Sequence, residues 1–118
     1  MILFLDKTSP KPGVDVVHNR GSIHAGPDCR RLEQEVEQLA GAKHRFVILD
    51  LADVTHIDSA AIGSIVRCLA RMKDSGGNLC LAGCGGMIVS SLKLTRLDKV
   101  VEIFPTAAAA ADKHSATN

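Results

Sequence analysis

The chain has 118 residues with a formal net charge of +1, and 46% of them are hydrophobic and 23% charged. These values match soluble globular proteins, so they exclude a disordered chain, and the length predicts a single domain over residues 1–118. With scattered Lys and Arg and only three aromatic residues, all Phe, the sequence offers neither the basic surface nor the stacking rings that a nucleic-acid partner requires.

Two segments predict an opening β region, Ile2–Leu5 and Val14–His18. The stretch Ser9-Pro10-Lys11-Pro12-Gly13 between them is rich in turn-forming residues. We therefore expect an antiparallel, hairpin-like edge, with the second strand ending at Gly21.

A helix is predicted between Pro27, a residue favoured at the first helical position, and Gly41, a residue favoured where helices stop. Its apolar residues recur at steps of three and four and form one stripe, Cys29, Leu32, Val36 and Leu39. Because the other faces are charged, this helix is expected to lie on a sheet.

The run Phe46-Val47-Ile48-Leu49 predicts a central strand that is buried on both faces. Asp50, Asp53 and Thr55 then suggest a turn, and Asp58-Ser59 has the residue types of a helix N-cap. A second helix is expected from Ser59 to about Ser75, where Ser75-Gly76-Gly77-Asn78 breaks its apolar period.

The remaining sequence predicts a strand at Leu79–Ala82, a helix at Met87–Leu94, a strand at Val100–Phe104 and an alanine-rich helix at Thr106–His114. The order is ββαβαβαβα. Strands separated by helices require parallel crossovers, so we expect an α/β fold with a mixed, mainly parallel sheet flanked by four helices.

The segment from Val47 to Gly63 joins an apolar strand, the turn Asp50-Leu51-Ala52-Asp53-Val54-Thr55-His56-Ile57-Asp58-Ser59 and a helix start with small residues. It resembles the STAS domains of anti-sigma factor antagonists, whose signature is D-L-x-x-V-x-x-[IM]-D-S. The likeness continues through Gly76-Gly77-Asn78-Leu79, Leu97-Asp98-Lys99 and Ile103-Phe104-Pro105-Thr106, and it covers residues 13–111.

The resemblance implies that Ser59, the serine directly after Asp58, is the residue that a cognate kinase phosphorylates. A helix N-terminus favours an added anion, and a phosphate there would place charge and bulk on a docking surface. The alternative is that Asp58 and Ser59 only cap the helix. Thr55 is a second candidate acceptor, for which a turn role is preferred.

The family's docking face implies partner contacts by His24, Asp58, Ser59, Ala60, Gly63, Ser64 and Arg67. Ala60, Gly63 and Ser64 are small and are predicted to lie away from the apolar face of the helix, with Arg67 and Arg71 continuing that side. The small residues would equally suit neighbouring packing. The sequence departs from the family at His24, where an Asp is usual, and at Ala61, where a Gly is usual.

Catalytic patterns are weak. His56 lies near Ser59 without a nucleophile elbow, and Gly83-Cys84-Gly85-Gly86 lacks the spacing of a phosphate-binding loop. The four cysteines form no CxxC pair and are expected to be free thiols, and His18, His24, His44 and His114 are expected at the surface without ligand spacing. We therefore predict no enzymatic activity, no metal and no cofactor.

No apolar run reaches the roughly 20 residues that span a bilayer, and Met1–Leu5 does not resemble a signal peptide, so a cytoplasmic protein is expected. The resemblance implies an anti-sigma factor antagonist that binds a histidine-kinase-like anti-sigma factor with serine kinase activity, as a monomer or weak dimer. The alternative is a STAS subunit that binds the ATPase of a lipid-transport ABC system, or a component of another signalling assembly.

Overall fold

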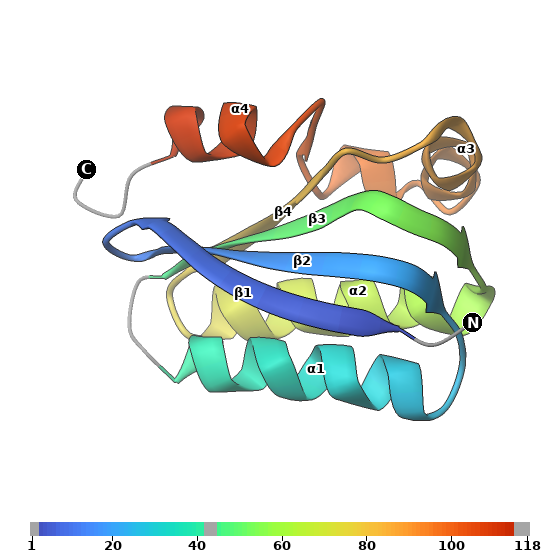
Figure 1. The fold of residues 1–118 in the computed structure, drawn as a ribbon, viewed down its shortest axis with the longest axis horizontal. Coiled ribbons are helices and arrows are strands. Elements are labelled where there is room, and N and C mark those ends of the chain that lie inside the picture. Colours follow the sequence, from blue (N-terminus) through green and yellow to red (C-terminus); the bar gives the residue numbers. More distant parts are fainter. Residues whose placement is uncertain (1–2, 42–44, 115–118) are drawn as a thin grey trace.

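A computed structural model describes residues 3–41 and 45–114, and the five strands of this part form one sheet in the order β1-β2-β3-β4-β5 (Figure 1). The strands are β1 Phe4–Lys11, β2 Val14–Ile23, β3 Phe46–Ile57, β4 Asn78–Ala82 and β5 Ile103–Phe104. β1 is antiparallel to β2, whereas the other neighbours are parallel. The predicted mixed sheet with an antiparallel edge is confirmed.

Four α-helices cover the sheet within the described residues: α1 Pro27–Ala40, α2 Ser59–Asp74, α3 Gly86–Leu94 and α4 Ala107–Lys113. α1 and α2 lie side by side on one face, and α4 lies on the other (Figure 1). A short 3₁₀-helix, η1 Leu97–Lys99, follows α3. The predicted α/β fold with four helices is confirmed, and each predicted helix is found within two residues of its expected bounds.

The larger core lies between the sheet and the α1–α2 layer. The predicted stripe of α1 is buried there, with Leu32 and Val36 almost completely inaccessible. On the sheet side it meets Val47, Leu49 and Leu51 of β3. The apolar period of the helix therefore matches the alternation of the strand, as an amphipathic helix on a sheet requires.

The prediction that β3 is buried on both faces is also confirmed. Phe46 and Ile48 point to the opposite face, where they join a second core with Ala110 and Ala111 of α4. The imidazole of His114 stacks on the Phe46 ring with 3.8 Å between the ring centroids. His114 is therefore half-buried and not the surface residue that the sequence suggested.

Three predicted boundaries are wrong. β1 continues to Lys11, so only Pro12 and Gly13 form the turn, and Ile2 lies outside the described residues. β2 does not end at Gly21 but continues to Ile23, because the positive φ of this glycine, 104°, allows a register shift without breaking the strand. β5 has two residues only, since the chain before it turns through η1.

The predicted turn after Leu49 is strand. β3 runs on to Ile57 because the end of β2 pairs with it, Gly21 opposite Val54 and Ile23 opposite Ile57. Thr55 is consequently an exposed strand residue, and its hydroxyl donates to the carbonyl of Gly21 at 3.1 Å. The polar residues that suggested a turn instead mark the side of β3 that no core covers.

A buried ion pair fixes the start of β2 against the chain entering β3. Asp15 is only 2% exposed, and its carboxylate accepts hydrogen bonds from Arg45, with Nη2 at 2.8 Å from Oδ1, and from the Ser9 hydroxyl at 2.6 Å. Burial alone would raise the pKa of Asp15, but the hydrogen bonds from Arg45 and Ser9 outweigh it and the pKa is lowered. Asp15 is therefore a charged residue inside the fold.

Candidate functional site

The N-terminal end of α2 is organised by Asp58, the last residue before the helix. Its backbone is extended, and Oδ1 accepts a hydrogen bond from the Ala61 N–H at 2.9 Å, which makes it the N-cap. Oδ2 accepts from the Ala25 N–H, also at 2.9 Å. One carboxylate thus caps α2 and holds the β2–α1 loop, which contains His24, against the start of the helix.

Ser59 is the first residue of α2, and its side chain is exposed. Among the described residues its hydroxyl has no hydrogen-bond partner, because Asp58 already provides the cap. The capping alternative therefore applies to Asp58 and not to Ser59. A free hydroxyl at an exposed helix start is accessible to a modifying enzyme.

The electrostatics at this end favour a charged Asp58. The N–H groups of Ala25 and Ala61 stabilise its carboxylate and lower its pKa, so it carries a negative charge at neutral pH. A phosphate on Ser59 would add about −1.5 to −2 charges beside it. The positive end of the helix dipole offsets part of this repulsion, but the first-turn N–H of Ala61 is already used by Asp58.

The residues predicted to form a docking face are only partly brought together. His24 and Arg67 are exposed, and Ala60 and Gly63 are half-buried on α2. Ser64 is a correction: it is fully buried, its hydroxyl donates to the Glu33 carboxylate at 2.5 Å, and the carbonyl of Cys29 lies 3.3 Å away. Its place in the helical period suggested a position away from the apolar face, but the alternative of close packing applies at Ser64, where α1 and α2 enclose its hydroxyl.

Two arginines of α2 form ion pairs across the outer side of the helix layer. Arg67 donates from Nε and Nη2 to the two carboxylate oxygens of Glu33 at 3.0 and 3.1 Å, and Arg71 pairs with Glu37 through Nε at 2.6 Å. The hydrogen bonds from Arg67 and Ser64 lower the pKa of Glu33. Arg67 and Arg71 therefore continue the side of α2 that the sequence indicated, but their guanidinium groups already bridge α2 to α1.

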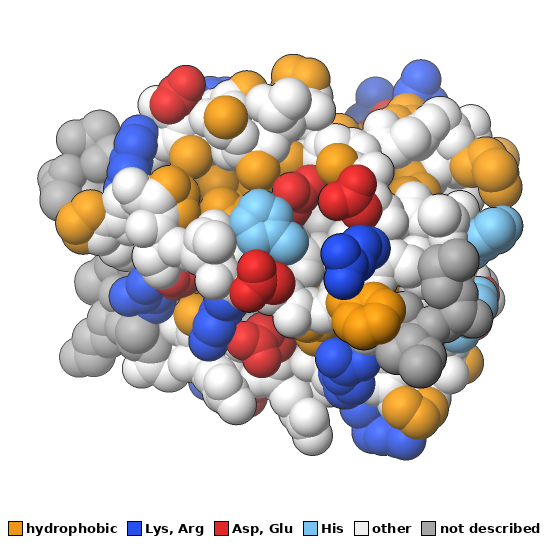
Figure 2. Space-filling model, viewed as in Figure 1, with side chains coloured by type: hydrophobic (Ala, Val, Ile, Leu, Met, Phe, Trp, Pro, Cys, Tyr) orange, Lys and Arg blue, Asp and Glu red, His pale blue; other side chains and the backbone are white. Residues whose placement is uncertain are grey.

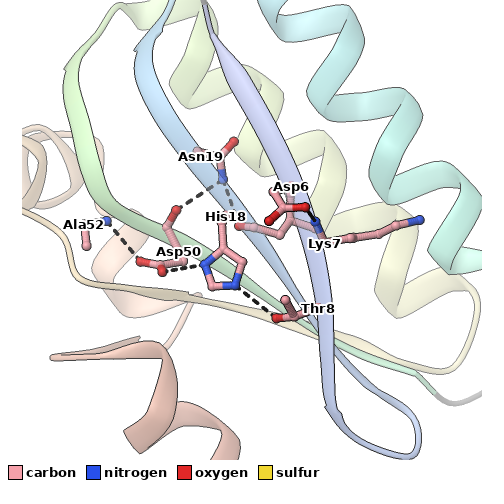
Figure 3. A network of polar contacts seen from close by, with 8 residues as sticks. Asp6, Lys7, Thr8, His18, Asn19, Asp50 and Ala52 are labelled. Carbon is pink, nitrogen blue, oxygen red and sulfur yellow. Dashed lines mark hydrogen bonds and ion pairs between the residues drawn. The ribbon is translucent and has the colours of Figure 1, made fainter.

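A hydrogen-bonded network that the sequence did not predict crosses the first three strands (Figure 3). The imidazole of His18 lies between Thr8 and Asp50, with 3.0 Å from Nε2 to the Thr8 hydroxyl and 2.9 Å from Nδ1 to Asp50 Oδ2. Asp50 also accepts from the Ala52 N–H at 3.1 Å. His18 is thus half-buried and hydrogen-bonded on both ring nitrogens. The chain of contacts from Thr8 through His18 to Asp50 links β1, β2 and β3.

Asn19 completes the network where β2 and β3 shift register. Its side-chain amide donates to the carbonyls of Val17 at 3.0 Å and Asp50 at 3.3 Å, directly beside the register shift between His18 and Arg20. Charged side chains of both signs surround a histidine on this side of the molecule (Figure 2). The network explains the local strand geometry and does not involve the start of α2.

The structure gives the weak catalytic patterns no support. His56 is exposed at the end of β3, and no hydrogen bond joins it to Ser59 or to another described residue. Gly85 and Gly86 begin α3 without a side-chain cap. Within residues 3–41 and 45–114, no three His, Cys, Asp or Glu side chains are placed to hold a metal ion.

The four cysteines are free thiols, as the sequence predicted. Cys29, Cys68 and Cys80 are buried, and burial raises the pKa of Cys68 and Cys80 to about 12 and that of Cys84 to about 11. His44 lies outside the described residues. In the part of the chain that is described, no helix combines the length and apolarity needed to cross a membrane.

The sequence and the fold were compared with those of known protein families. The sequence profile of the STAS domain matches residues 11–110, which include every element from β2 to α3 and therefore the start of α2. The chain belongs to the STAS domain family. A curated STAS relative from Thermotoga maritima, provisionally named an anti-sigma factor antagonist, is 38% identical over 60 residues. That match covers 51% of this chain and 53% of the relative, so it spans about half of the relative's length.

Solved structures agree on the fold. An anti-sigma factor antagonist from Mycobacterium paratuberculosis superposes with a TM-score of 0.80 at 20% identity, over 95% of this chain and 93% of that one. The Bacillus cell fate determinant SpoIIAA in its phosphorylated form gives 0.74 at 12% identity, over 93% and 98%. The STAS fold predicted from the sequence is confirmed.

Proposed function

We propose that this STAS domain is an anti-sigma factor antagonist-like regulator that docks a kinase-type anti-sigma partner at the start of α2 and is switched by phosphorylation of Ser59. One observation carries the proposal: Ser59 presents an exposed, unbonded hydroxyl at a helix start that Asp58 already caps. The fold does not need this hydroxyl, so its modification can change binding without unfolding the domain.

The physical basis of the switch is charge on a docking surface. Phosphate would convert a small neutral group into a doubly charged one next to the carboxylate of Asp58, whose lowered pKa keeps it ionised. A partner that buries this position against its own surface would then have to desolvate two adjacent anionic groups. Phosphorylation should therefore release the partner.

The docking face includes the loop that Asp58 holds. His24 is exposed on that loop, and its placement next to the α2 start follows from the Ala25–Asp58 hydrogen bond. Since the family usually has an Asp at this position, we expect the cognate partner to present a complementary group for His24. Ala60, Gly63 and Arg67 would contribute the remaining contacts on α2, and Ser64 would not.

The proposal also includes action in the cytoplasm as a monomer or weak dimer, without turnover of its own. Purified protein should leave ATP and GTP intact over hours. Steady hydrolysis that is lost on changing a residue of the loop 83–86 would overturn this part.

The direct test is phosphotransfer. The histidine-kinase-like ATPase encoded nearest to this chain's gene would be incubated with the purified domain and ATP, and the products mapped by mass spectrometry. We expect one phosphate, on Ser59, and none on the Ser59→Ala variant. Phosphate on Thr55 or on another residue, or none at all with an active kinase, would contradict the proposal. Melting curves of both proteins provide the folding control.

A further inference from the structure

α3 carries two large apolar side chains that the fold leaves in water. Met87 is 74% exposed and Leu94 is 86% exposed, although the opposite side of the same helix buries Ile88 and Leu92 in the core. Single exposed apolar residues need no explanation, but an exposed apolar residue that borders an apolar hollow can form part of a binding surface.

Leu94 borders such a hollow, and Met87 does not. The hollow has a volume of about 240 Å³ and lies between the start of α2 and the end of α3, with Ile57, Ile62, Leu94 and Thr95 in its lining. Ser59 and Asp58 line its other side. The apolar groove is therefore continuous with the candidate phosphorylation site, and a partner that covers one would cover the other.

Both carboxylate oxygens of Asp58, the charged residue in the lining, are bonded to the N–H groups of Ala25 and Ala61, so the free charges beside the groove indicate what it would accept. Lys93 and Arg96 flank Leu94 and Thr95 in the sequence, both are exposed, and neither forms an ion pair with a described residue. Lys99 in η1 is also exposed and unpaired, and Asp98 is the one acidic residue in this stretch. Arg67, Arg71 and Lys113 have carboxylate partners, whereas Arg30 and Lys73 are, like Lys93, exposed without an ion pair among the described residues. What bears on the occupant is therefore the position of Lys93 and Arg96 directly beside the residues that line the groove.

We propose that this groove, Ile57, Ile62, Leu94 and Thr95, receives an aliphatic side chain from an acidic segment of a partner protein, whose carboxylates pair with Lys93 and Arg96. The inference rests on the proposed docking function and identifies the chemistry of the docked element. It is argued from the apolar lining, the unpaired cations next to it and its continuity with Ser59.

The groove would also make the switch more effective. An aliphatic side chain seated between α2 and α3 excludes water from the side of Ser59 that faces the groove. A phosphate on Ser59 would then stand at the edge of a dry contact and would repel the acidic segment through charge. Both effects act in the same direction, toward release.

The test uses three peptides as probes, so that no natural partner is required. ¹⁵N-labelled full-length protein would be titrated with acetyl-Glu-Glu-Leu-Glu-Glu-amide, with the same peptide carrying Ser in place of Leu, and with acetyl-Lys-Lys-Leu-Lys-Lys-amide. We expect the amides of Ile62, Leu94 and Thr95 to shift with the first peptide. Affinity should fall about tenfold without the leucine, as expected for burial of one such side chain, and also with the reversed charge.

Two variants make the assignment residue-specific. Leu94→Ser should lower the affinity for the acidic leucine peptide about tenfold. Met87→Ser changes an exposed apolar residue on the same helix outside the groove and should leave this affinity unchanged. Both positions are mostly exposed, so melting curves should match those of the wild type.

The proposal is overturned if the three peptides bind wild-type protein equally, if the shifts fall outside the groove, or if the Leu94 and Met87 variants behave alike. None of these outcomes depends on phosphorylation. Failure here is therefore distinguishable from failure of the Ser59 switch, which the phosphotransfer experiment measures separately.

Discussion

The buried ion pair between Asp15 and Arg45 makes the sharpest stability prediction. Asp15→Ala removes the acceptor from Arg45 and Ser9 and leaves a guanidinium partly enclosed without its counter-charge. Breaking a fully buried pair costs about 3–5 kcal/mol. Because the Arg45 side chain is 25% exposed and can recover some hydration, we expect the low end, about 3 kcal/mol.

In a domain of this length, about 3 kcal/mol corresponds to a decrease of about 12 °C in Tm, which differential scanning calorimetry measures directly. The matched control is Glu37→Gln, which removes an exposed ion pair with Arg71 and should change Tm little. An unchanged Tm for Asp15→Ala, or equal decreases for the two variants, would show that the Asp15–Arg45 pair does not stabilise the fold.

The same pair predicts a direction for the pH dependence. The pKa of Asp15 is lower in the folded protein than in the unfolded chain, so the unfolded state binds the proton first as the pH falls. The stabilisation is complete above the unfolded pKa of about 4 and is lost as the pH falls below it toward the folded pKa. Wild type should therefore lose stability more steeply below pH 4 than Asp15→Ala does, and parallel profiles would contradict the assignment.

Three further predictions concern packing and thiol chemistry. Ser64→Ala deletes a fully buried hydroxyl that bonds to Glu33 and should cost about 1–2 kcal/mol by urea denaturation, whereas an exposed docking residue would cost nothing. Gly77→Ala should destabilise by about 1–3 kcal/mol, because a Cβ would meet the Arg45 carbonyl at 2.1 Å, while Gly85→Ala, with nothing within 4 Å, should be neutral. A disulfide reagent at pH 8 should leave Cys68 and Cys80, whose pKa burial raises to about 12, unmodified until urea unfolds the protein. Rapid labelling of these two thiols in the native protein would contradict their burial.

The order of elements and the α2 N-cap could be predicted because their signals are local. Asp58 precedes an apolar helical period, and an acidic N-cap bonds to an N–H only three residues away. Burial of β3 on both faces could likewise be predicted from the run Phe46-Val47-Ile48-Leu49. A strand covered on both faces has no alternation of apolar and polar residues.

What the sequence did not predict depends on contacts between distant segments. The polar stretch after Leu49 suggested a turn, but pairing with the end of β2, some thirty residues earlier, keeps it extended. The Thr8–His18–Asp50 network joins three strands, and its residue types carry no fixed spacing that would reveal it. Ser64 was misplaced because its surroundings depend on Glu33 and Cys29 of α1, which no helical period within α2 encodes.

We propose that phosphate on Ser59 turns docking off. It is tested by calorimetry of the kinase-type anti-sigma partner with four proteins: wild type, Ser59→Ala, Ser59→Asp and homogeneously phosphorylated domain, each checked for folding by a melting curve. We expect wild type and Ser59→Ala to bind alike, because this hydroxyl caps nothing. The phosphorylated protein should bind at least about 100-fold more weakly, close to 3 kcal/mol. Ser59→Asp, with part of the charge, should fall between. Equal affinity for wild type, Ser59→Asp and the phosphorylated domain would contradict the serine switch and would favour a STAS subunit that binds a transport ATPase.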